Sequence, residues 1–149
     1  MKRLLALAAL SLSPLLMAAE DAKPSKLAVY LNQQCSDDSV GQRLAFRIKE
    51  ELSTSTSMTA ADSYDASVVQ VSLVCLNPTI QESGSVSRYS YQVTLLNLKG
   101  FYDFALTHGV GACGGQRVAE CAEGIVANID QAVSELRVRI KNGSFKWPN

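Results

Sequence analysis

Apolar and polar residues alternate along several stretches of the chain, and this period of two is typical of strands. The alternation predicts strands at 27–32, 66–76, 88–98 and 101–107, with a short edge strand at 58–61. The stretch 66–76 is apolar on one face and half apolar on the other. We therefore expect it to lie in the interior of a sheet, where both faces are partly covered.

Two other stretches follow the period of an α-helix. Val40, Leu44, Ile48 and Leu52 recur every four residues and predict a helix at about 39–53, with N-cap candidates at 36–39. A longer stripe that includes Val118, Ala122, Ile125 and Ile129 predicts a helix at about 115–141, which Gly143 would end. The resulting order is β-α-(β)-β-β-β-α.

This order predicts an α+β fold, a two-layer α/β sandwich. We expect a mixed sheet of four or five strands with two helices on one face. The strand at 27–32 can pair in parallel with 66–76 through a right-handed crossover, and the last three strands can form an antiparallel meander. Residues 27–143 are then a single domain, followed by a flexible tail at 144–149.

The N-terminus has the three parts of a secretory signal peptide. Lys2 and Arg3 form a basic head, an apolar run follows to Met17, and Ala18 and Ala19 precede polar residues. The run is shorter than the roughly 20 residues needed to span a bilayer. We expect cleavage after residue 19, which would leave a polar leader at 20–26 and a periplasmic protein. The alternative is that the N-terminal segment is retained as an anchor.

Four cysteines agree with an oxidising compartment. An even number in an exported chain indicates two disulfides, with three connectivities open. We favour Cys35–Cys75, which would join the ends of the parallel strands, and Cys113–Cys121, which would close a short loop. Spacings of 40, 38 and 8 residues do not resemble a zinc site. Unpaired buried thiols remain an alternative.

Composition excludes several functions. The chain of 149 residues is 47% apolar and carries 14 basic and 14 acidic side chains, so its charge does not favour nucleic acid as a partner. Removing Lys2 and Arg3 with the signal peptide leaves 12 basic and 14 acidic residues, a charge of −2. One histidine leaves little material for a metal site or for acid–base catalysis. Asp37 and Asp38 precede a helix, where capping explains them better than metal binding.

The pattern of elements resembles a small α/β domain found at the N-terminus of periplasmic TolB and in curli-secretion and penicillin-binding-protein-activator lipoproteins. The resemblance rests on residues 27–31, the helix at 40–52, the strand pattern at 64–71 and the strand at 91–98 before the long final helix. It implies a domain that binds other envelope proteins and is not catalytic. The chain differs in its four cysteines and in lacking a β-propeller or lipid anchor, and no site residue transfers.

The strongest chemical motif is a glycine-rich segment. Gly109-Val-Gly-Ala-Cys-Gly114 matches G-x-G-x-x-G between a strand and a helix, but no second βαβ unit or acidic strand end follows. We therefore expect a turn at 109–115 and no nucleotide cofactor. An anion at the amides of the last helix is an intermediate interpretation. His108 lies beside this segment without a clear nucleophile or orienting acid.

A recognition surface is the last candidate. Tyr89 and Tyr91 share one face of a strand and Arg88 the other, and these residue types are common in interfaces. The alternative is that the tyrosines cover the core. Trp147, in the tail, could belong to a docking peptide or to a free end.

We therefore expect an exported, non-enzymatic module that binds an envelope protein, as an assembly factor or as an inhibitor or immunity protein against a toxin or hydrolase. No cofactor, metal, nucleic acid or integral membrane segment is expected. The alternative is a small periplasmic hydrolase or anion-binding protein that uses His108 and the turn from Gly109 to Gly115.

Overall fold

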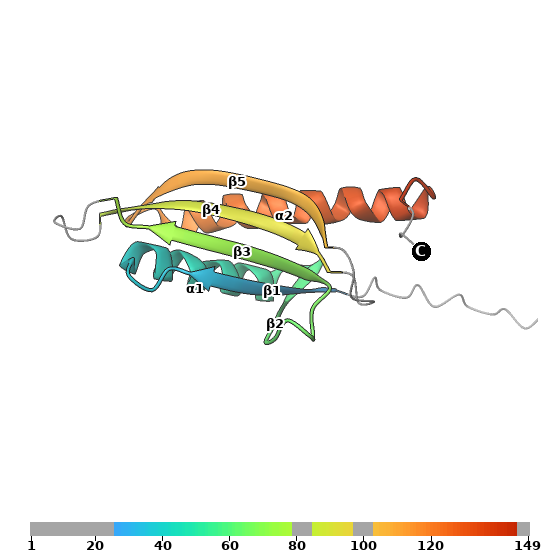
Figure 1. The fold of residues 1–149 in the computed structure, drawn as a ribbon, viewed down its shortest axis with the longest axis horizontal. Coiled ribbons are helices and arrows are strands. Elements are labelled where there is room, and N and C mark those ends of the chain that lie inside the picture. Colours follow the sequence, from blue (N-terminus) through green and yellow to red (C-terminus); the bar gives the residue numbers. More distant parts are fainter. Residues whose placement is uncertain (1–25, 79–84, 97–102, 146–149) are drawn as a thin grey trace, which may run out of the picture.

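The computed structural model describes residues 26–78, 85–96 and 103–145. These residues form five strands and two helices (Figure 1), which follow the chain as β1 (Leu27–Gln34), α1 (Ser39–Thr54), β2 (Met58–Ala61), β3 (Val69–Leu76), β4 (Val86–Leu95), β5 (Phe104–Gly114) and α2 (Val118–Lys141). The expected α+β fold and its order of elements are confirmed. The signal peptide and nearly all of the leader lie outside the described residues.

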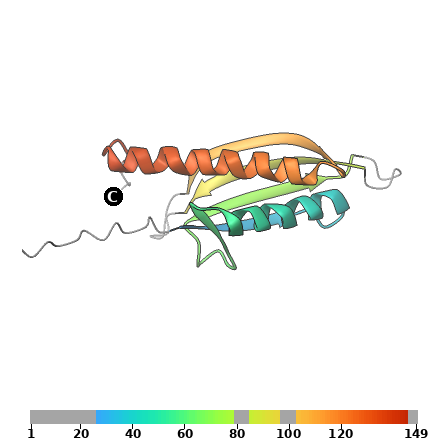
Figure 2. The same cartoon turned by 180° about the vertical axis from the view of Figure 1, so that it is seen from behind.

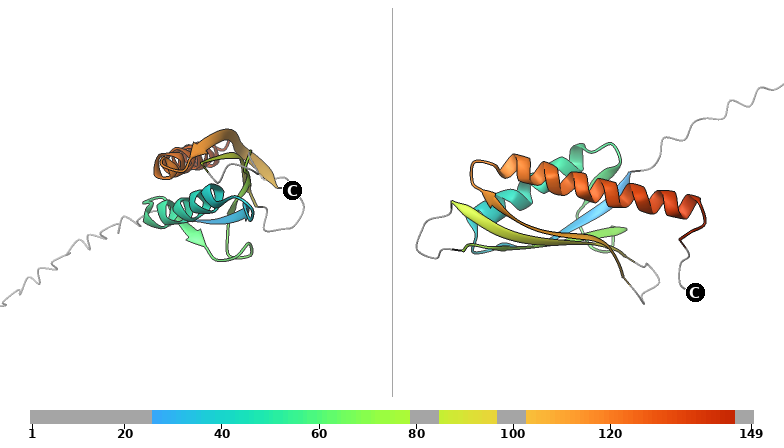
Figure 3. Two further views of the ribbon diagram at one scale, coloured as in Figure 1. Left: turned by 90° about the vertical axis from the view of Figure 1, so that its left-hand side faces the viewer. Right: turned by 90° about the horizontal axis from the view of Figure 1, so that it is seen from above.

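The five strands form one mixed sheet in the order β2-β1-β3-β4-β5. β1 pairs in parallel with both β2 and β3, whereas β3, β4 and β5 form an antiparallel meander. Both helices lie side by side on one face of this sheet (Figures 2 and 3). The expected parallel pairing of the first strand with the strand that ends at Leu76 is therefore confirmed.

The core lies between the sheet and the two helices. On β3, Val69, Val71 and Leu73 are at most 1% exposed, because strand residues two apart point to the same face. Equivalent stripes of both helices meet this face, and their members are fully or almost fully buried: Leu44, Ile48 and Leu52 on α1, and Ile125, Ile129 and Val133 on α2. The alternate residues of the strands are left on a face that no helix covers.

The start of α1 rests on a disulfide. Asp38 is the N-cap, and its Oδ1 accepts a hydrogen bond of 2.9 Å from the Gly41 amide. A Cβ at position 41 would lie 2.5 Å from the Cβ of Cys75, so only glycine fits there. Cys75 is joined to Cys35, which places the first turn of α1 directly over the ends of β1 and β3.

Both favoured disulfides are present. Cys35–Cys75 links the ends of β1 and β3, and Cys113–Cys121 links the end of β5 to the first turn of α2. The described residues contain no free cysteine, which removes the alternative of buried thiols.

Several boundaries differ from the sequence analysis: β3 begins at Val69 instead of residue 66, β4 spans Val86–Leu95 instead of 88–98, and β5 begins at Phe104 instead of residue 101. The largest difference lies at the end of β5. The expected turn at 109–115 is wrong for residues 109–114, because β5 continues to Gly114, and α2 begins at Val118 instead of residue 115. Glycines favour turns by their conformational freedom, but here they lie in a strand, because two tyrosine rings occupy the space that their side chains would fill.

The expected flexible tail is corrected at its beginning. The Ser144 and Phe145 amides donate hydrogen bonds to the Arg139 carbonyl, and the Phe145 ring packs edge-on against Phe104 at a centroid distance of 5.8 Å. Trp147 lies outside the described residues.

The two disulfides differ in the length of the loop that each closes, with sequence separations of 40 and 8 residues. We expect Cys35→Ala/Cys75→Ala to lower the free energy of unfolding by about 4 kcal/mol and Cys113→Ala/Cys121→Ala by about 2.5 kcal/mol, because a longer loop restricts the unfolded chain more. Urea denaturation of the two double variants measures this. Equal losses would contradict the loop-entropy explanation.

Candidate functional site at the free edge of the sheet

Two tyrosines of β4 lie across two glycines of β5. Tyr89 pairs with Gly111 and Tyr91 with Gly109 in the antiparallel register. A Cβ at position 109 would lie 2.5 Å from Cε1 of Tyr91, and one at position 111 would lie 2.6 Å from the hydroxyl oxygen of Tyr89. The glycine motif therefore makes room for two aromatic rings, which stack on each other at a centroid distance of 6.5 Å.

Tyr89 and Tyr91, two residues of the candidate recognition surface, face the helix layer. Tyr91 is only 6% exposed, and its hydroxyl oxygen accepts a hydrogen bond of 3.0 Å from Nδ2 of Asn128 on α2. Tyr89 is half-buried, and burial, followed by the neighbouring Tyr91, raises the pKa of its phenol. Tyr91 covers the core, which is the alternative expected for both tyrosines. Arg88 is exposed on the opposite face, as expected.

Between β5 and α2 lies a small groove of about 330 Å³. Tyr89 and Tyr91 form its floor, and the segment from His108 to Val110 forms its rim on β5. The structure thus brings together the tyrosines and the His108–Gly109 segment, which the sequence had suggested for separate roles.

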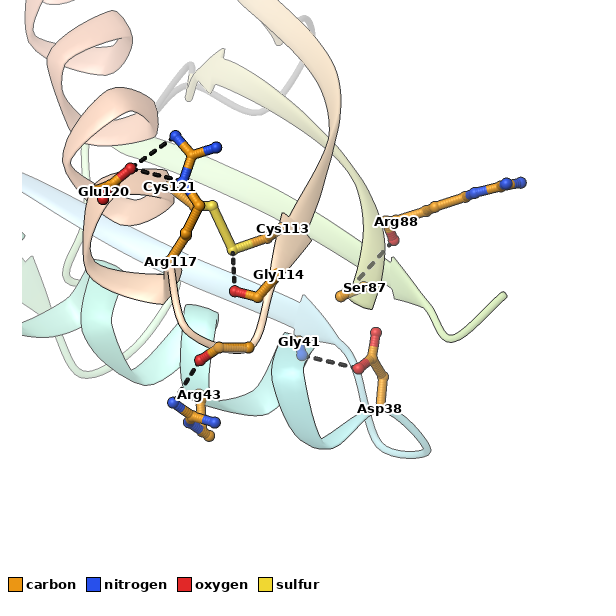
Figure 4. The surroundings of a disulfide bond; sticks show 11 residues. Asp38, Gly41, Arg43, Ser87, Arg88, Cys113, Gly114, Arg117, Glu120 and Cys121 are labelled. Carbon is orange, nitrogen blue, oxygen red and sulfur yellow. Dashed lines mark hydrogen bonds and ion pairs between the residues drawn. A yellow bond between two sulfur atoms is a disulfide. The ribbon is translucent and has the colours of Figure 1, made fainter. Parts of the chain in front are cut away.

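The α2 wall of the groove was not foreseen from the sequence. It includes Glu120, Gly124 and Asn128, which in the sequence are only polar or small positions beside the apolar stripe of the helix. Glu120 forms an exposed ion pair of 2.7 Å with Arg117. The disulfide joins β5 to α2 beside this ion pair (Figure 4), so the two walls are covalently connected at one end of the groove.

β5 is an outer strand of the sheet and has a free edge. The Gly115 amide donates a hydrogen bond to the Ser85 carbonyl, so these two residues form a hydrogen-bonded pair at the start of the β4–β5 ladder. In an antiparallel ladder, hydrogen-bonded pairs alternate with pairs that share no hydrogen bond. Residues 109, 111 and 113 therefore also form hydrogen bonds with β4. The N–H and C=O groups of His108, Val110 and Ala112 consequently point outward from the sheet.

The side chains of these three residues lie on the sheet face that the helices leave open (Figure 3). Val110 is 82% exposed, and Leu76 on β3 is 66% exposed. Arg88 lies between Leu76 and Ala112 in the register, and Ser90 lies between Val74 and Val110. One end of the open face therefore presents apolar side chains around a single cation (the apolar end, defined as Val74, Leu76, Arg88, Val110 and Ala112).

The geometry does not assemble the elements of the hydrolase alternative. His108 is exposed, and its neighbour in the register is Gln92 on β4. The segment 109–114 is a strand and cannot wrap an anion as a loop would. Among the described residues no group of three His, Cys, Asp or Glu side chains could hold a metal ion, and Asp38 serves as a helix cap.

In the part of the chain that the structure describes, neither helix is long and apolar enough to cross a membrane.

The solved structures that resemble this chain include three distant ones. No protein-family model and no curated protein matches the chain. A hypothetical protein of Chlamydia trachomatis is 8% identical with a TM-score of 0.39, over 59% of this chain and 72% of that one. A PelC variant from Paraburkholderia phytofirmans, solved as a dodecamer, is 9% identical with a TM-score of 0.43, over 68% and 86%.

A third structure, a lipoprotein candidate from Caulobacter crescentus, is 14% identical with a TM-score of 0.33, over 71% of this chain and 90% of that one. Similarities at this level support no conclusion about function. None of these three is a protein that the element pattern resembles, so the resemblance to the TolB and curli-secretion domains stays a prediction.

The tyrosine–glycine packing predicts different costs for the same substitution at two positions. We expect Gly109→Ala to lower the free energy of unfolding by about 2 kcal/mol, because the new methyl group would meet the buried ring of Tyr91, which cannot move away. Gly111→Ala should cost less than about 1 kcal/mol, because half-buried Tyr89 can swing outward. Chemical denaturation of both variants tests this, and a larger loss at position 111 would contradict it.

Proposed function

We propose that this chain is an exported, non-enzymatic protein-binding module that recognises another envelope protein through the open face of its sheet. The partner could be one that the chain helps to assemble, or a toxin or hydrolase that it inhibits. The observation that carries the proposal is the apolar end of the open face.

The apolar end has the features of a contact surface. Val110 and Leu76 are 82% and 66% exposed, although each lies in a regular strand. Exposed apolar side chains that gather in one part of a surface are unfavourable in water and commonly mark sites where another protein binds, and here the apolar residues of β3 and β5 lie on either side of Arg88 and Ser90. Arg88 in their midst supplies a charged group of the type that often contributes strongly to interfaces.

Export is supported by two independent features. Residues 1–19 have the pattern of a cleaved signal peptide, and the four cysteines are paired in two disulfides, which persist in oxidising compartments such as the periplasm. The second candidate function, a small hydrolase or anion-binding protein that uses His108, is not favoured by any contact of that side chain.

Substitution of Leu76 tests the proposed surface. We expect Leu76→Asp to weaken binding of the partner at least about tenfold, because a carboxylate that must lose its water would replace an apolar contact and would pair with the neighbouring Arg88, drawing it away from the partner. The matched control is Phe46→Asp, at a residue of α1 that is 64% exposed on the helix side of the molecule. Stability should change little in either variant, because both side chains are largely in solvent.

The measurement is affinity capture from a periplasmic extract of the native host, followed by mass spectrometry and titration of the captured protein. A stoichiometric partner that binds the wild type and Phe46→Asp but not Leu76→Asp supports the proposal. Equal binding by both variants, or a small molecule that co-purifies without any protein, contradicts it.

A further inference from the structure

We infer that the partner contributes an extended segment, which adds to β5 as a sixth strand and places side chains in the groove between β5 and α2. This inference rests on the proposed protein-binding function and specifies how the partner is recognised.

The two edges of the sheet differ in a way that leaves only one available to another strand. β2 has four residues and is tied to α2, because Ser57 donates a hydrogen bond to Asp130 and the Ser57 carbonyl accepts one of 3.1 Å from Arg137. β5 has 11 residues, and none of them is proline, lysine, arginine or an acid. Natural proteins protect long edges with such residues, so an unprotected edge is suited to strand addition.

The outward main-chain groups of β5 define what fits the edge. His108, Val110 and Ala112 each direct one N–H and one C=O away from the sheet. These groups span five residues, or about 17 Å of strand. Only an extended backbone offers acceptors and donors at this alternate spacing, so the complementary ligand is a short extended peptide segment.

The groove gives such a segment a place for its side chains. Alternate residues of an added strand would point to the open face, beside Val110, and to the groove. The rings of Tyr89 and Tyr91 fill the space in front of Gly109 and Gly111, but a Cβ at Gly124 on α2 would touch nothing within 4 Å. Room for an added side chain therefore lies along the α2 wall.

The chemistry of the groove favours a polar side chain that donates hydrogen bonds. Four polar residues line the groove, namely Tyr89, Tyr91, Asn128 and Glu120, whose carboxylate also pairs with Arg117. The Tyr91 oxygen already accepts from Asn128, whereas none of the described residues bonds to the Tyr89 hydroxyl. We expect a residue with an amide, hydroxyl or amino group at this position of the segment, and an apolar residue beside it in sequence, against Val110.

A second copy of this chain fits the edge less well. If β5 of another copy were added, the residues pointing to the groove would be Gly109 and Gly111 of that copy, together with Thr107. Glycines would leave the groove empty. A segment from a different protein, with a side chain at this position, fills it.

A proline at Val110 tests strand addition without disturbing the chain's own ladder, because the Val110 N–H points outward and proline is tolerated at such an edge position. The probe is a random 12-residue peptide displayed on phage and selected on the oxidised, purified protein. We expect selected peptides to bind Val110→Pro roughly tenfold or more weakly, because one hydrogen bond is lost and the ring obstructs the incoming backbone. Val110→Ser is the matched comparison: like the proline variant it loses the apolar contact, but it keeps the N–H, so it should bind the selected peptides clearly more tightly than Val110→Pro does.

Amide hydrogen exchange on the wild type gives an answer even if Val110→Pro does not fold. Without peptide, the amides of His108, Val110 and Ala112 should exchange fast and those of Gly109 and Gly111 slowly, and the bound peptide should slow only the first three. Strand addition is overturned by peptides that bind Val110→Pro as tightly as Val110→Ser, or by bound peptides that leave the three amides unprotected. Protection that grows with protein concentration alone also overturns it, in favour of a second copy. These results are independent of the Leu76→Asp test, which decides whether a partner uses the open face at all.

Discussion

The fold depends on a sheet that can bury only one of its faces. On β3 the buried Val69, Val71 and Leu73 alternate with Gln70 and Ser72, so helices can be accommodated on one side only. Both helices therefore share that side, and the sheet is left with an open face. The strand order places β5 at one edge of the sheet, and α2 packs beside it. The open face, the edge and the groove are all consequences of this one arrangement.

The contact between the tyrosines of β4 and the glycines of β5 shows how a single packing solution can serve two purposes. The rings need the absence of side chains at positions 109 and 111, and in return they cover backbone that would otherwise be exposed. The phenol groups then reach the space between β5 and α2. A segment that resembles a nucleotide-binding motif in sequence is thus explained by the strand opposite, and not by a ligand.

Much of the architecture could be predicted from periodicity, because burial of one face leaves a regular trace in the sequence. The stripe from Val40 to Leu52 placed α1 within one residue of its observed end, and the cysteine count with the parallel strand pair led to the right disulfides. The end of β5 could not be predicted, because the reason for its glycines lies about 20 residues earlier, in Tyr89 and Tyr91. The groove was missed for a similar reason: Glu120 and Asn128 line it only because α2 packs beside β5.

The position of β1 also has a consequence for how the chain reaches this structure. β1 lies between two strands that are both made later in the sequence, and it pairs with neither through a hairpin. The meander of β3, β4 and β5 is connected more locally, whereas insertion of β1 requires closure of a much longer loop, which is entropically slower. The bond between Cys35 and Cys75 spans that loop. Once this pair is oxidised, the bond keeps the end of β1 next to the end of β3 even during partial unfolding.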